Sequence, residues 1–302
     1  MKKFLVIIAL SAIAFAKPVF LLLDHHQKGV NAVAFSPDGK TLVTGSDDST
    51  ARVWDADSGE VLLKLTGHEG WVLSVAVNGD GVVATADSEG RVAIWDTNKK
   101  TLLRVIQAHR AWVRAITFSE DGKRLATGAD DATVKIWDTN TGKLLRTLTG
   151  HTNWITGVLF IDNQVVSSSR DGTVQFWNAV SGNNTRKLEL EQWIYYLALS
   201  PDGTRFATAA QNGVKIWNRI NGRLIQTVSE RISWAVAFSP DRLRLAIGNA
   251  DGSIELFDAK TFEKQQTLQA HTSYIKALTF SPDSQKLASA SRDGMARIWM
   301  LP

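Results

Sequence analysis

The chain has 302 residues, enough for one large domain or two small ones, and 44% of them are apolar, enough to form a buried core. Its formal charge at pH 7 is only +4 and its Lys and Arg residues are scattered, which argues against nucleic acid as a ligand and against a basic lipid-binding patch. Cysteine is absent, so thiol catalysis, thiolate zinc sites and disulfide bridges are excluded.

The first 16 residues are predicted to be a secretory signal peptide. Lys2 and Lys3 precede thirteen uncharged residues, and the A-x-A pattern at 14–16 suits cleavage after Ala16. The apolar stretch is shorter than the about 20 residues that a membrane span needs. An apolar strand or core helix and an uncleaved anchor are the alternatives. We therefore expect an exported domain of residues 17–302 without stable membrane insertion after cleavage; it would be periplasmic, or else secreted, or membrane-tethered if uncleaved.

Residues 18–66 are predicted to form five short strands. Their β-branched residues alternate with other residues, and Pro, Gly, Asp and Ser occupy the turns between them. The expected strands are PVFLLLD (18–24), VNAVAFS (30–36), TLVTGS (41–46), TARVWD (50–55) and VLLKLT (61–66). The last four make one antiparallel unit, whereas the strand at 18–24 resembles a fourth strand that has no unit before it.

The four-strand unit recurs seven times along the chain. The third strands end as ARVWD (51–55), VAIWD (92–96), VKIWD (134–138), VQFWN (174–178), VKIWN (214–218), IELFD (254–258) and ARIWM (296–300). The spacing between their aromatic residues is 40 to 42 residues, and no segment has a sustained helical period. One four-stranded sheet cannot bury both of its faces, but seven sheets stacked around an axis can. We therefore predict an all-β, seven-bladed β-propeller of four-stranded antiparallel blades.

The repeats resemble those of the WD-repeat (WD40) family, in its bacterial exported type, over residues 18–302. The motif Gly-His precedes a first strand at Gly67-His68 and Gly150-His151, with the variants Ala108-His109, Ala270-His271 and His25-His26. Five units also keep the Trp-Asp or Trp-Asn dipeptide at the end of the third strand.

The resemblance implies that a His, a Ser or Thr, an Asp and the third-strand Trp form a hydrogen-bonded chain inside each blade. Buried polar groups need such partners, since each one without a partner costs about 1–3 kcal/mol. The expected sets are His26, Thr44, Asp48 and Trp54; His68, Thr85, Glu89 and Trp95; His109, Thr127, Asp131 and Trp137; His151, Ser167, Asp171 and Trp177; and His271, Ser289, Asp293 and Trp299. We expect these residues to be structural and not catalytic.

Blades 5 and 6 depart from this pattern. Blade 5 has Leu190 at the His position, with Thr208, Asn212 and Trp217, and blade 6 has Ser229, Ile247, Asp251 and Phe257. Their internal networks should be partial, and this sector is expected to open first.

The strand at 18–24 is expected to close the ring. The seventh unit has only three strands before the chain ends, so its last strand, MARIW (295–299), would otherwise present an open edge. Pairing of the two segments would complete the seventh blade.

Five Trp residues lie outside the third strands. Trp71, Trp112, Trp154 and Trp193, with Tyr274, lie three residues after the His position, and Trp234 and Tyr195 lie two residues further on. In the family that the chain resembles, these positions lie on the top face around the central opening. Arg114 and Lys276 would lie among them.

Clustered aromatic residues with a few cations are typical of a protein-binding surface. We therefore expect a monomeric, non-catalytic scaffold that binds a protein or peptide of unknown identity, without a cofactor or metal. The alternatives are that the aromatic residues only pack the strand entrances, that the protein is a glycan-binding module, or that it is an envelope enzyme such as a lactonase, a glycosidase or a quinone-dependent dehydrogenase. The residues Asp24-His25-His26 are interpreted as loop and network residues and not as metal ligands.

Overall fold

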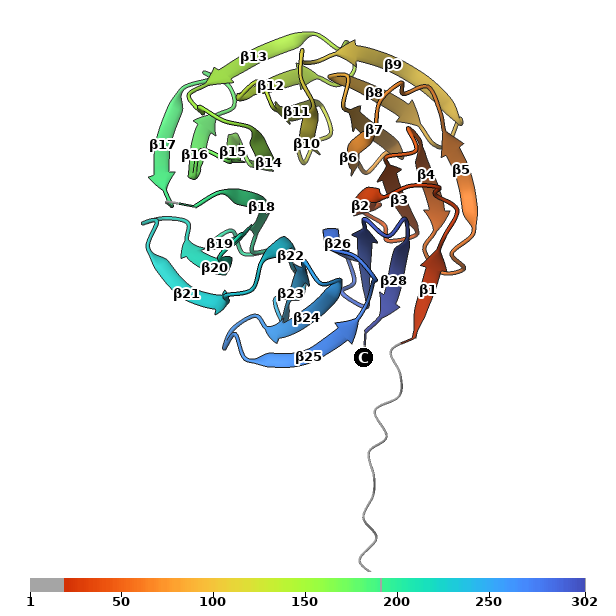
Figure 1. Cartoon of the computed structure of the whole chain (residues 1–302). Helices are drawn as coiled ribbons and strands as arrows, with labels where there is room; N and C mark the ends of the chain where they lie inside the picture. Colours follow the sequence, from red (N-terminus) through yellow and green to blue (C-terminus); the bar gives the residue numbers. More distant parts are fainter. Residues whose placement is uncertain (1–18, 191, 302) are drawn as a thin grey trace, which may run out of the picture.

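Seven four-stranded antiparallel sheets surround a central axis in the computed structural model, which describes residues 19–190 and 192–301 (Figure 1). Each sheet is one blade, with its first strand at the axis and its fourth strand at the outer rim. The predicted seven-bladed propeller is thus confirmed. The predicted signal peptide at 1–16 lies outside the described residues.

The strands follow the repeat closely. Blade 1 contains β2 (Val30–Phe35), β3 (Thr41–Ser46), β4 (Ala51–Asp55) and β5 (Val61–Leu65). Blade 2 contains β6 (Val72–Val77), β7 (Val82–Asp87), β8 (Arg91–Asp96) and β9 (Thr101–Gln107). Blade 3 contains β10 (Val113–Phe118), β11 (Arg124–Ala129), β12 (Thr133–Asp138) and β13 (Leu144–Thr149). Blade 4 contains β14 (Ile155–Ile161), β15 (Gln164–Ser169), β16 (Thr173–Asn178) and β17 (Asn184–Glu189).

The remaining blades have the same order. Blade 5 contains β18 (Ile194–Leu199), β19 (Arg205–Ala210), β20 (Gly213–Asn218) and β21 (Leu224–Ser229). Blade 6 contains β22 (Ser233–Phe238), β23 (Arg244–Asn249), β24 (Ser253–Asp258) and β25 (Lys264–Gln269). Blade 7 contains β26 (Ile275–Phe280), β27 (Lys286–Ser291), β28 (Ala296–Met300) and β1 (Phe20–Leu23). Within 19–190 and 192–301, no helix has the length and apolarity needed to cross a membrane.

The hydrophobic core consists of the interfaces between neighbouring blades. In one such cluster, Ile94 of blade 2 packs with Leu125 and Trp137 of blade 3, and all three side chains are almost fully buried. Burial of each large apolar side chain contributes about 1.5–3 kcal/mol. Each blade is therefore stabilised mainly by its two neighbours and not by its own sheet alone.

Close contact between blades requires a very small residue at one position of the second strand. A Cβ atom added to Gly128 would lie only 2.4 Å from Cγ2 of Ile155 in the next blade. Gly45 and Gly248 approach Val72 and Ile275 of the following blades in the same way, at 2.7 Å and 2.6 Å. A side chain at these positions would push neighbouring blades apart, since such contacts are shorter than any that real Cβ atoms make.

The N-terminal strand closes the ring, as predicted. β1 pairs antiparallel with β28 and places Phe20 opposite Trp299 and Leu23 opposite Ala296. Leu23 is fully buried in the core, and the Phe20 and Trp299 rings lie 4.8 Å apart. Because β1 is an outer strand, Phe20 and Leu22 stay 40% and 43% exposed. Closure therefore relies on the backbone ladder and on Leu23 more than on several buried side chains.

Candidate functional site

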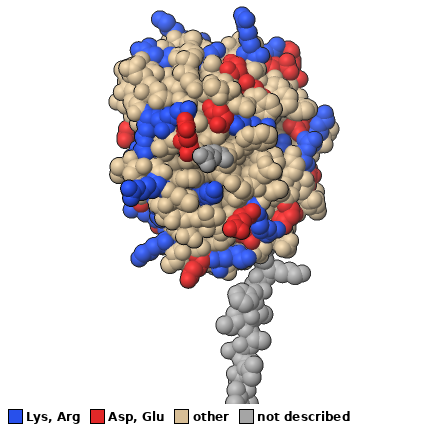
Figure 2. Space-filling model, turned by 60° about the vertical axis from the view of Figure 1, so that its left-hand side comes forward, with Lys and Arg blue, Asp and Glu red and all other residues tan. Residues whose placement is uncertain are grey.

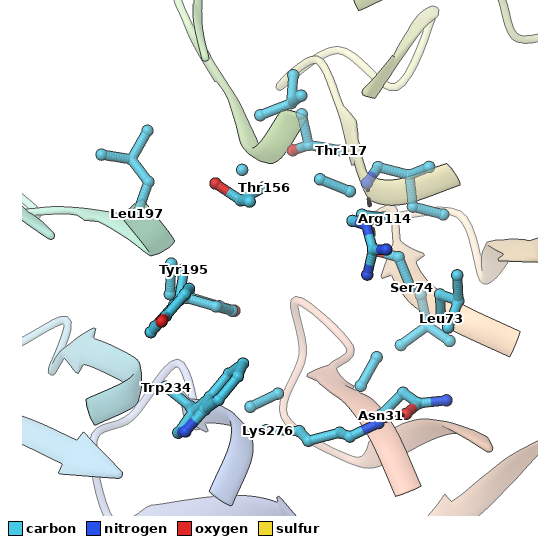
Figure 3. A pocket seen from close by; sticks show the side chains of 18 of the residues that line it. Asn31, Leu73, Ser74, Arg114, Thr117, Thr156, Tyr195, Leu197, Trp234 and Lys276 are labelled. Carbon is cyan, nitrogen blue, oxygen red and sulfur yellow. Dashed lines mark hydrogen bonds between the residues drawn. The ribbon is translucent and has the colours of Figure 1, made fainter. Parts of the chain in front are cut away.

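Each first strand carries a β-bulge near its beginning. The pairing with the second strand skips one residue, and a bulge of this kind turns the side chain of the skipped residue to a new direction. The seven skipped residues are Asn31, Leu73, Arg114, Thr156, Tyr195, Trp234 and Lys276. All seven line a cavity of about 440 Å³ at the axis of the propeller, where Figure 3 shows them converging from different blades.

We call the side of the propeller where the first strands begin the top face. The turns between second and third strands also lie there, and their first residues are tied to the entrance of the first strands. The backbone N–H of this turn residue donates to the carbonyl of the residue two positions before the bulge. The pairs are Asp47 with Gly29, Ser88 with Trp71, Asp130 with Trp112, Arg170 with Trp154, Ala250 with Ile232 and Arg292 with Tyr274, at 2.9–3.2 Å. Three sequence positions per blade therefore share the rim of the cavity.

Aromatic rings, with cations between some of them, follow one another around this rim, starting in blade 2. The rings of Trp71 and Trp112 pack edge to face with centroids 5.3 Å apart. The Arg114 guanidinium lies 5.0 Å from the Trp112 ring and 4.5 Å from the Trp154 ring. Arg170 contacts the same Trp154 ring at 4.4 Å. Each of these contacts is of cation–π or aromatic geometry, and the Trp71–Trp112 and Arg114–Trp154 contacts join one blade to the next.

The contacts continue through blades 5 to 7. Arg170 lies 5.7 Å from the Tyr195 ring, and Tyr195 stacks on Trp234 with centroids 4.4 Å apart and planes within 8°. Trp234 packs on Tyr274 at 5.2 Å, and the Lys276 ammonium lies 5.9 Å from the Tyr274 ring. We call these nine residues, from Trp71 to Lys276, the aromatic–cation series.

The charged groups of the rim have different partners. Arg114 makes a bidentate ion pair with Asp130, with its Nη2 2.8 Å from Oδ2. Lys276 donates to the amide oxygen of Asn31, whose Nδ2 donates to Asp47 at 2.7 Å. Burial lowers the pKa of Lys276 below its usual value against the opposing effect of the Asp47 carboxylate, and the nearby cations Arg292 and Arg114 act in the same direction as burial. The rim thus holds cations in an environment that disfavours charge unless an anion is near.

Among the cations of the rim, Arg170 has the fewest polar partners in the part of the chain that the structure describes. Its Nε is buried and has no hydrogen-bond partner among the residues that the structure describes. Burial lowers the pKa of Arg170, and the nearby positive charge of Arg114 lowers it further. The group stays charged at neutral pH because the ordinary pKa of a guanidinium is above 12.

The structure places eight of the nine predicted site residues in one continuous series. Arg114, Tyr195, Trp234, Tyr274 and Lys276 line the cavity itself. Trp71 and Trp112 are 41% and 37% exposed. Trp193 stands apart from the ring contacts and is the most exposed of these tryptophans, at 56%.

The prediction missed Arg170, along with the paired carboxylates Asp47 and Asp130. All three occupy the first position of the turn between second and third strands. A comparison of that turn position across the seven units could have found them, because its backbone bonds to the rim in six of the blades.

The hydrogen-bonded chains lie inside the blades, away from the cavity. In blade 3, Trp137 Nε1 donates to the Thr127 hydroxyl at 3.0 Å, and this hydroxyl lies 2.7 Å from Nε2 of His109. Nδ1 of His109 lies 2.8 Å from Asp131. The same chain occurs in blades 1, 4 and 7 through His26, Thr44, Asp48 and Trp54; His151, Ser167, Asp171 and Trp177; and His271, Ser289, Asp293 and Trp299.

Blade 2 corrects the prediction for Glu89. The carboxylate that meets His68 belongs to Asp87, at 2.6 Å, while Thr85 bonds the other ring nitrogen as expected. Asp87 ends β7, two residues before Glu89, and its other oxygen accepts from the backbone N–H groups of Glu89 and Arg91. Asp87 is fully buried and reaches the His from the strand, so the longer Glu89 side chain is not needed.

In blade 5, a side chain from a different sequence position takes the place of the His. Leu190 is buried among apolar residues, and Gln192, two residues later, approaches the Thr208 hydroxyl at 3.4 Å. Trp217 still donates to this hydroxyl at 2.9 Å. Blade 6 has no such hydroxyl, because Ile247 and Phe257 are buried there instead.

The arrangement of Ser167, His151 and Asp171 has the same members as the triad of a serine hydrolase. The Ser167 hydroxyl is fully buried and already accepts a hydrogen bond from Trp177, so no substrate reaches it. Among the described residues, no three His, Asp or Glu side chains converge in a way that could hold a metal ion.

Comparison with known proteins gives one family. The model described as "WD domain, G-beta repeat" matches seven times, at residues 17–55, 59–96, 100–138, 142–178, 183–218, 222–258 and 262–300. Similar curated proteins include apoptotic protease-activating factor 1 of Rattus norvegicus (29% identical over 91% of this chain) and autophagy-related protein 16 of Arabidopsis thaliana (27% over 91%). Nuclear distribution protein PAC1-2 of Uncinocarpus reesii is 30% identical over 92%. The chain spans only 26%, 48% and 60% of the lengths of these relatives.

Proposed function

Because the chain belongs to the WD40-repeat family, we propose that it is a non-catalytic scaffold that binds a protein or peptide through its top face. The aromatic–cation series carries this proposal. It offers a continuous rim of rings and cations around a cavity, and such residues dominate the energetics of protein interfaces.

The charge pattern on one face of the molecule favours a peptide or protein over a nucleic acid as ligand. On the face seen in Figure 2, the described Lys and Arg side chains are interspersed with Asp and Glu and form no continuous basic surface. Binding to a phosphate backbone needs several cations in a row. One relative is named for activating a protease, and we propose that this chain likewise acts on a protein.

We propose that the protein is exported to the cell envelope. The support is the sequence of residues 1–16, with its two lysines, uncharged stretch and A-x-A ending. N-terminal sequencing of protein purified from its native cells should begin at Lys17. A mature protein that begins at Met1 would contradict export by cleavage.

Site-specific photo-crosslinking tests the binding function. A photoreactive amino acid at Trp193, which is exposed on the top face, should give discrete adducts with one protein or peptide in native cells. The matched control is Ile220, which is 75% exposed in a turn on the opposite face and should give no such adduct. Equal adducts at both positions, or none at Trp193, would contradict the proposed function.

A further inference from the structure

The cavity at the axis is lined by cations without a lining carboxylate. Arg114, Arg170 and Lys276 are the charged residues among those that line it. The carboxylates of the rim, Asp47 and Asp130, lie behind them and pair with Arg292 and Arg114. Four cations and two carboxylates leave a net charge of +2 at the mouth of the cavity.

The hydrogen-bonding capacity of these cations is only partly used. Arg114 donates two of its N–H groups to Asp130, and Lys276 donates one of its three to Asn31. Arg170 makes no ion pair with the described residues, although it is half-buried and its Nε has no partner. Nε itself is closed to solvent, as it is in Arg52 and Arg297, but Arg170 lines the cavity and its terminal N–H groups make no hydrogen bond to the described residues, so they are available to an acceptor that enters the cavity.

The surroundings of Arg170 fix the direction from which an acceptor can come. Its guanidinium contacts the rings of Trp154 and Tyr195, 4.4 Å and 5.7 Å from their centroids. With rings packed near the guanidinium plane, its N–H groups are left to interact along its edge. A carboxylate is planar and takes two parallel N–H groups along that edge.

We propose that the cavity mouth binds the carboxylate of an Asp or Glu side chain from a peptide segment of the partner. Arg170 holds the carboxylate, Arg114 and Lys276 add positive charge to the same cavity, and apolar residues that flank the acid in the peptide pack on the stacked Tyr195 and Trp234. This inference rests on the proposed function, since it specifies what the top face recognises.

A peptide fits these observations better than other anions. A nucleic-acid strand repeats its charge at every nucleotide, whereas the positive charge here is confined to the mouth of one cavity. A cavity of about 440 Å³ accepts one or two side chains and not a folded domain. The exposed Trp193 beside it can extend the contact along a chain.

The test starts from a displayed library of random twelve-residue peptides, selected on the chain of residues 17–302. We expect the recovered peptides to share an Asp or Glu next to an aromatic or aliphatic residue. Calorimetry with the tightest peptide should show a loss of about 10- to 100-fold in affinity when this acid is replaced by its amide, because hydrogen bonds to charged groups are the strong ones.

Variants of the protein locate the acid in the cavity. Arg170→Met should lower the affinity for the acidic peptide by a similar factor. The affinity for the amide peptide should be nearly the same on the parent and on this variant, because the two substitutions remove the same interaction. Lys276→Met provides a second, independent loss. The control Arg223→Met removes the same charge from an exposed turn on the opposite face and should bind like the parent. Thermal melts of each variant check that the fold is kept.

Different results of these experiments would contradict either the proposed function or only the carboxylate site. If no peptide is recovered, both the proposed function and this inference are contradicted. If peptides bind without an acid, or bind Arg170→Met unchanged, peptide binding stands and the carboxylate site is wrong. If uronic-acid oligosaccharides or oligothymidylate bind in an Arg170-dependent way and acidic peptides do not, the ligand is a glycan or a nucleic acid and the inference is overturned.

Discussion

At the scale of single residues, one hydroxyl group holds several buried polar groups together in most blades. Thr127 accepts from the Trp137 indole and lies within hydrogen-bond distance of Nε2 of His109. The hydroxyl proton can go to Nε2 only if His109 carries its own proton on Nδ1, which faces Asp131. The chain is thus satisfied with a neutral imidazole and an ionised carboxylate.

Blade 2 allows a matched test of which carboxylate belongs to its chain. Asp87→Ala should lower the free energy of unfolding by about 1.5–3 kcal/mol, because His68 loses a charged partner in a buried site. Glu89→Ala should change it by less than about 0.5 kcal/mol, as surface substitutions usually do. Urea unfolding measures both. A larger effect at Glu89 than at Asp87 would contradict the assignment.

The His–Asp pairs also couple stability to pH. Burial acts to raise the pKa of Asp131, but hydrogen bonds from His109 and Thr133 outweigh it and bring the pKa to about 2. Burial lowers the pKa of His26 and His271 below 6.5, against the opposing effect of their Asp partners. As the pH falls below about 6.5, the unfolded chain binds protons at these two His positions before the folded chain does. Below about 4 the unfolded carboxyl groups follow.

Stability should therefore fall throughout acidification. The His contribution is present above pH 6.5 and declines below it, and the Asp131 contribution is present above pH 3.8 and is lost as the pH falls toward 2. Thermal melts between pH 7 and pH 3 should give a Tm that decreases steadily, with net proton uptake on unfolding at pH 5. A Tm that rises or stays level below pH 6 would contradict the neutral-His chain.

At the scale of strands and blades, the sequence predicts what depends on local pattern. Strand alternation, turn residues and the repeat spacing place every blade, because each depends on residues close in the chain. Asp87 and Gln192 escaped prediction for a common reason. Each brings its side chain to the expected point from a backbone position two residues away, and spacing alone cannot reveal this.

The rim shows the same limit of prediction. The aromatic residues follow the His position at fixed spacing and could be identified, whereas Arg170 lies in a turn that joins other strands. Its place beside Trp154 depends on the backbone hydrogen bond between the two residues. Only the registers of the strands bring these segments together.

Bonds between blades are unevenly distributed around the ring. Arg104, Arg146 and Arg186, each on a fourth strand, donate to turn carbonyls of the following blade, at 2.5–2.8 Å. The residue with the same strand register in blade 5 is Gln226, which donates to its neighbour Thr227 instead. Blades 5 and 6 therefore combine partial internal chains with the lack of this fourth-strand Arg, although Arg205 and Arg244 of their second strands still donate to carbonyls of the following blades.

Hydrogen exchange should show the consequence. Amides of β19, β20, β23 and β24 should exchange faster than those of β11, β12, β15 and β16, because less free energy is needed to open a sector with fewer buried hydrogen bonds. Mass spectrometry of exchanged peptides measures this directly. Equal protection of the two sectors would show that apolar packing alone sets the opening energy.

At the scale of the whole molecule, the ring depends on one junction between distant segments. Every other blade is a continuous stretch of chain, but blade 7 takes its fourth strand from residues 20–23. Met300 donates to the carbonyl of Val19, so the two segments meet as they would in a hairpin without its turn. An exposed edge at β28 would be open to pairing with other chains.

β1 should be needed as the fourth strand of blade 7, whichever end of the chain supplies it. Deletion of residues 19–24 should give aggregated or poorly cooperative protein, since it removes the buried Leu23 and the ladder on β28. Leu23→Ala alone should cost about 2–5 kcal/mol, as for other buried leucines. A permuted chain of residues 25–301 followed by a two-residue turn and residues 19–24 restores the same pairing as a hairpin, and it should melt cooperatively within a few degrees of the parent. If the deletion melts as well as the permuted chain, β1 is dispensable and the other six blade interfaces hold the ring shut without it.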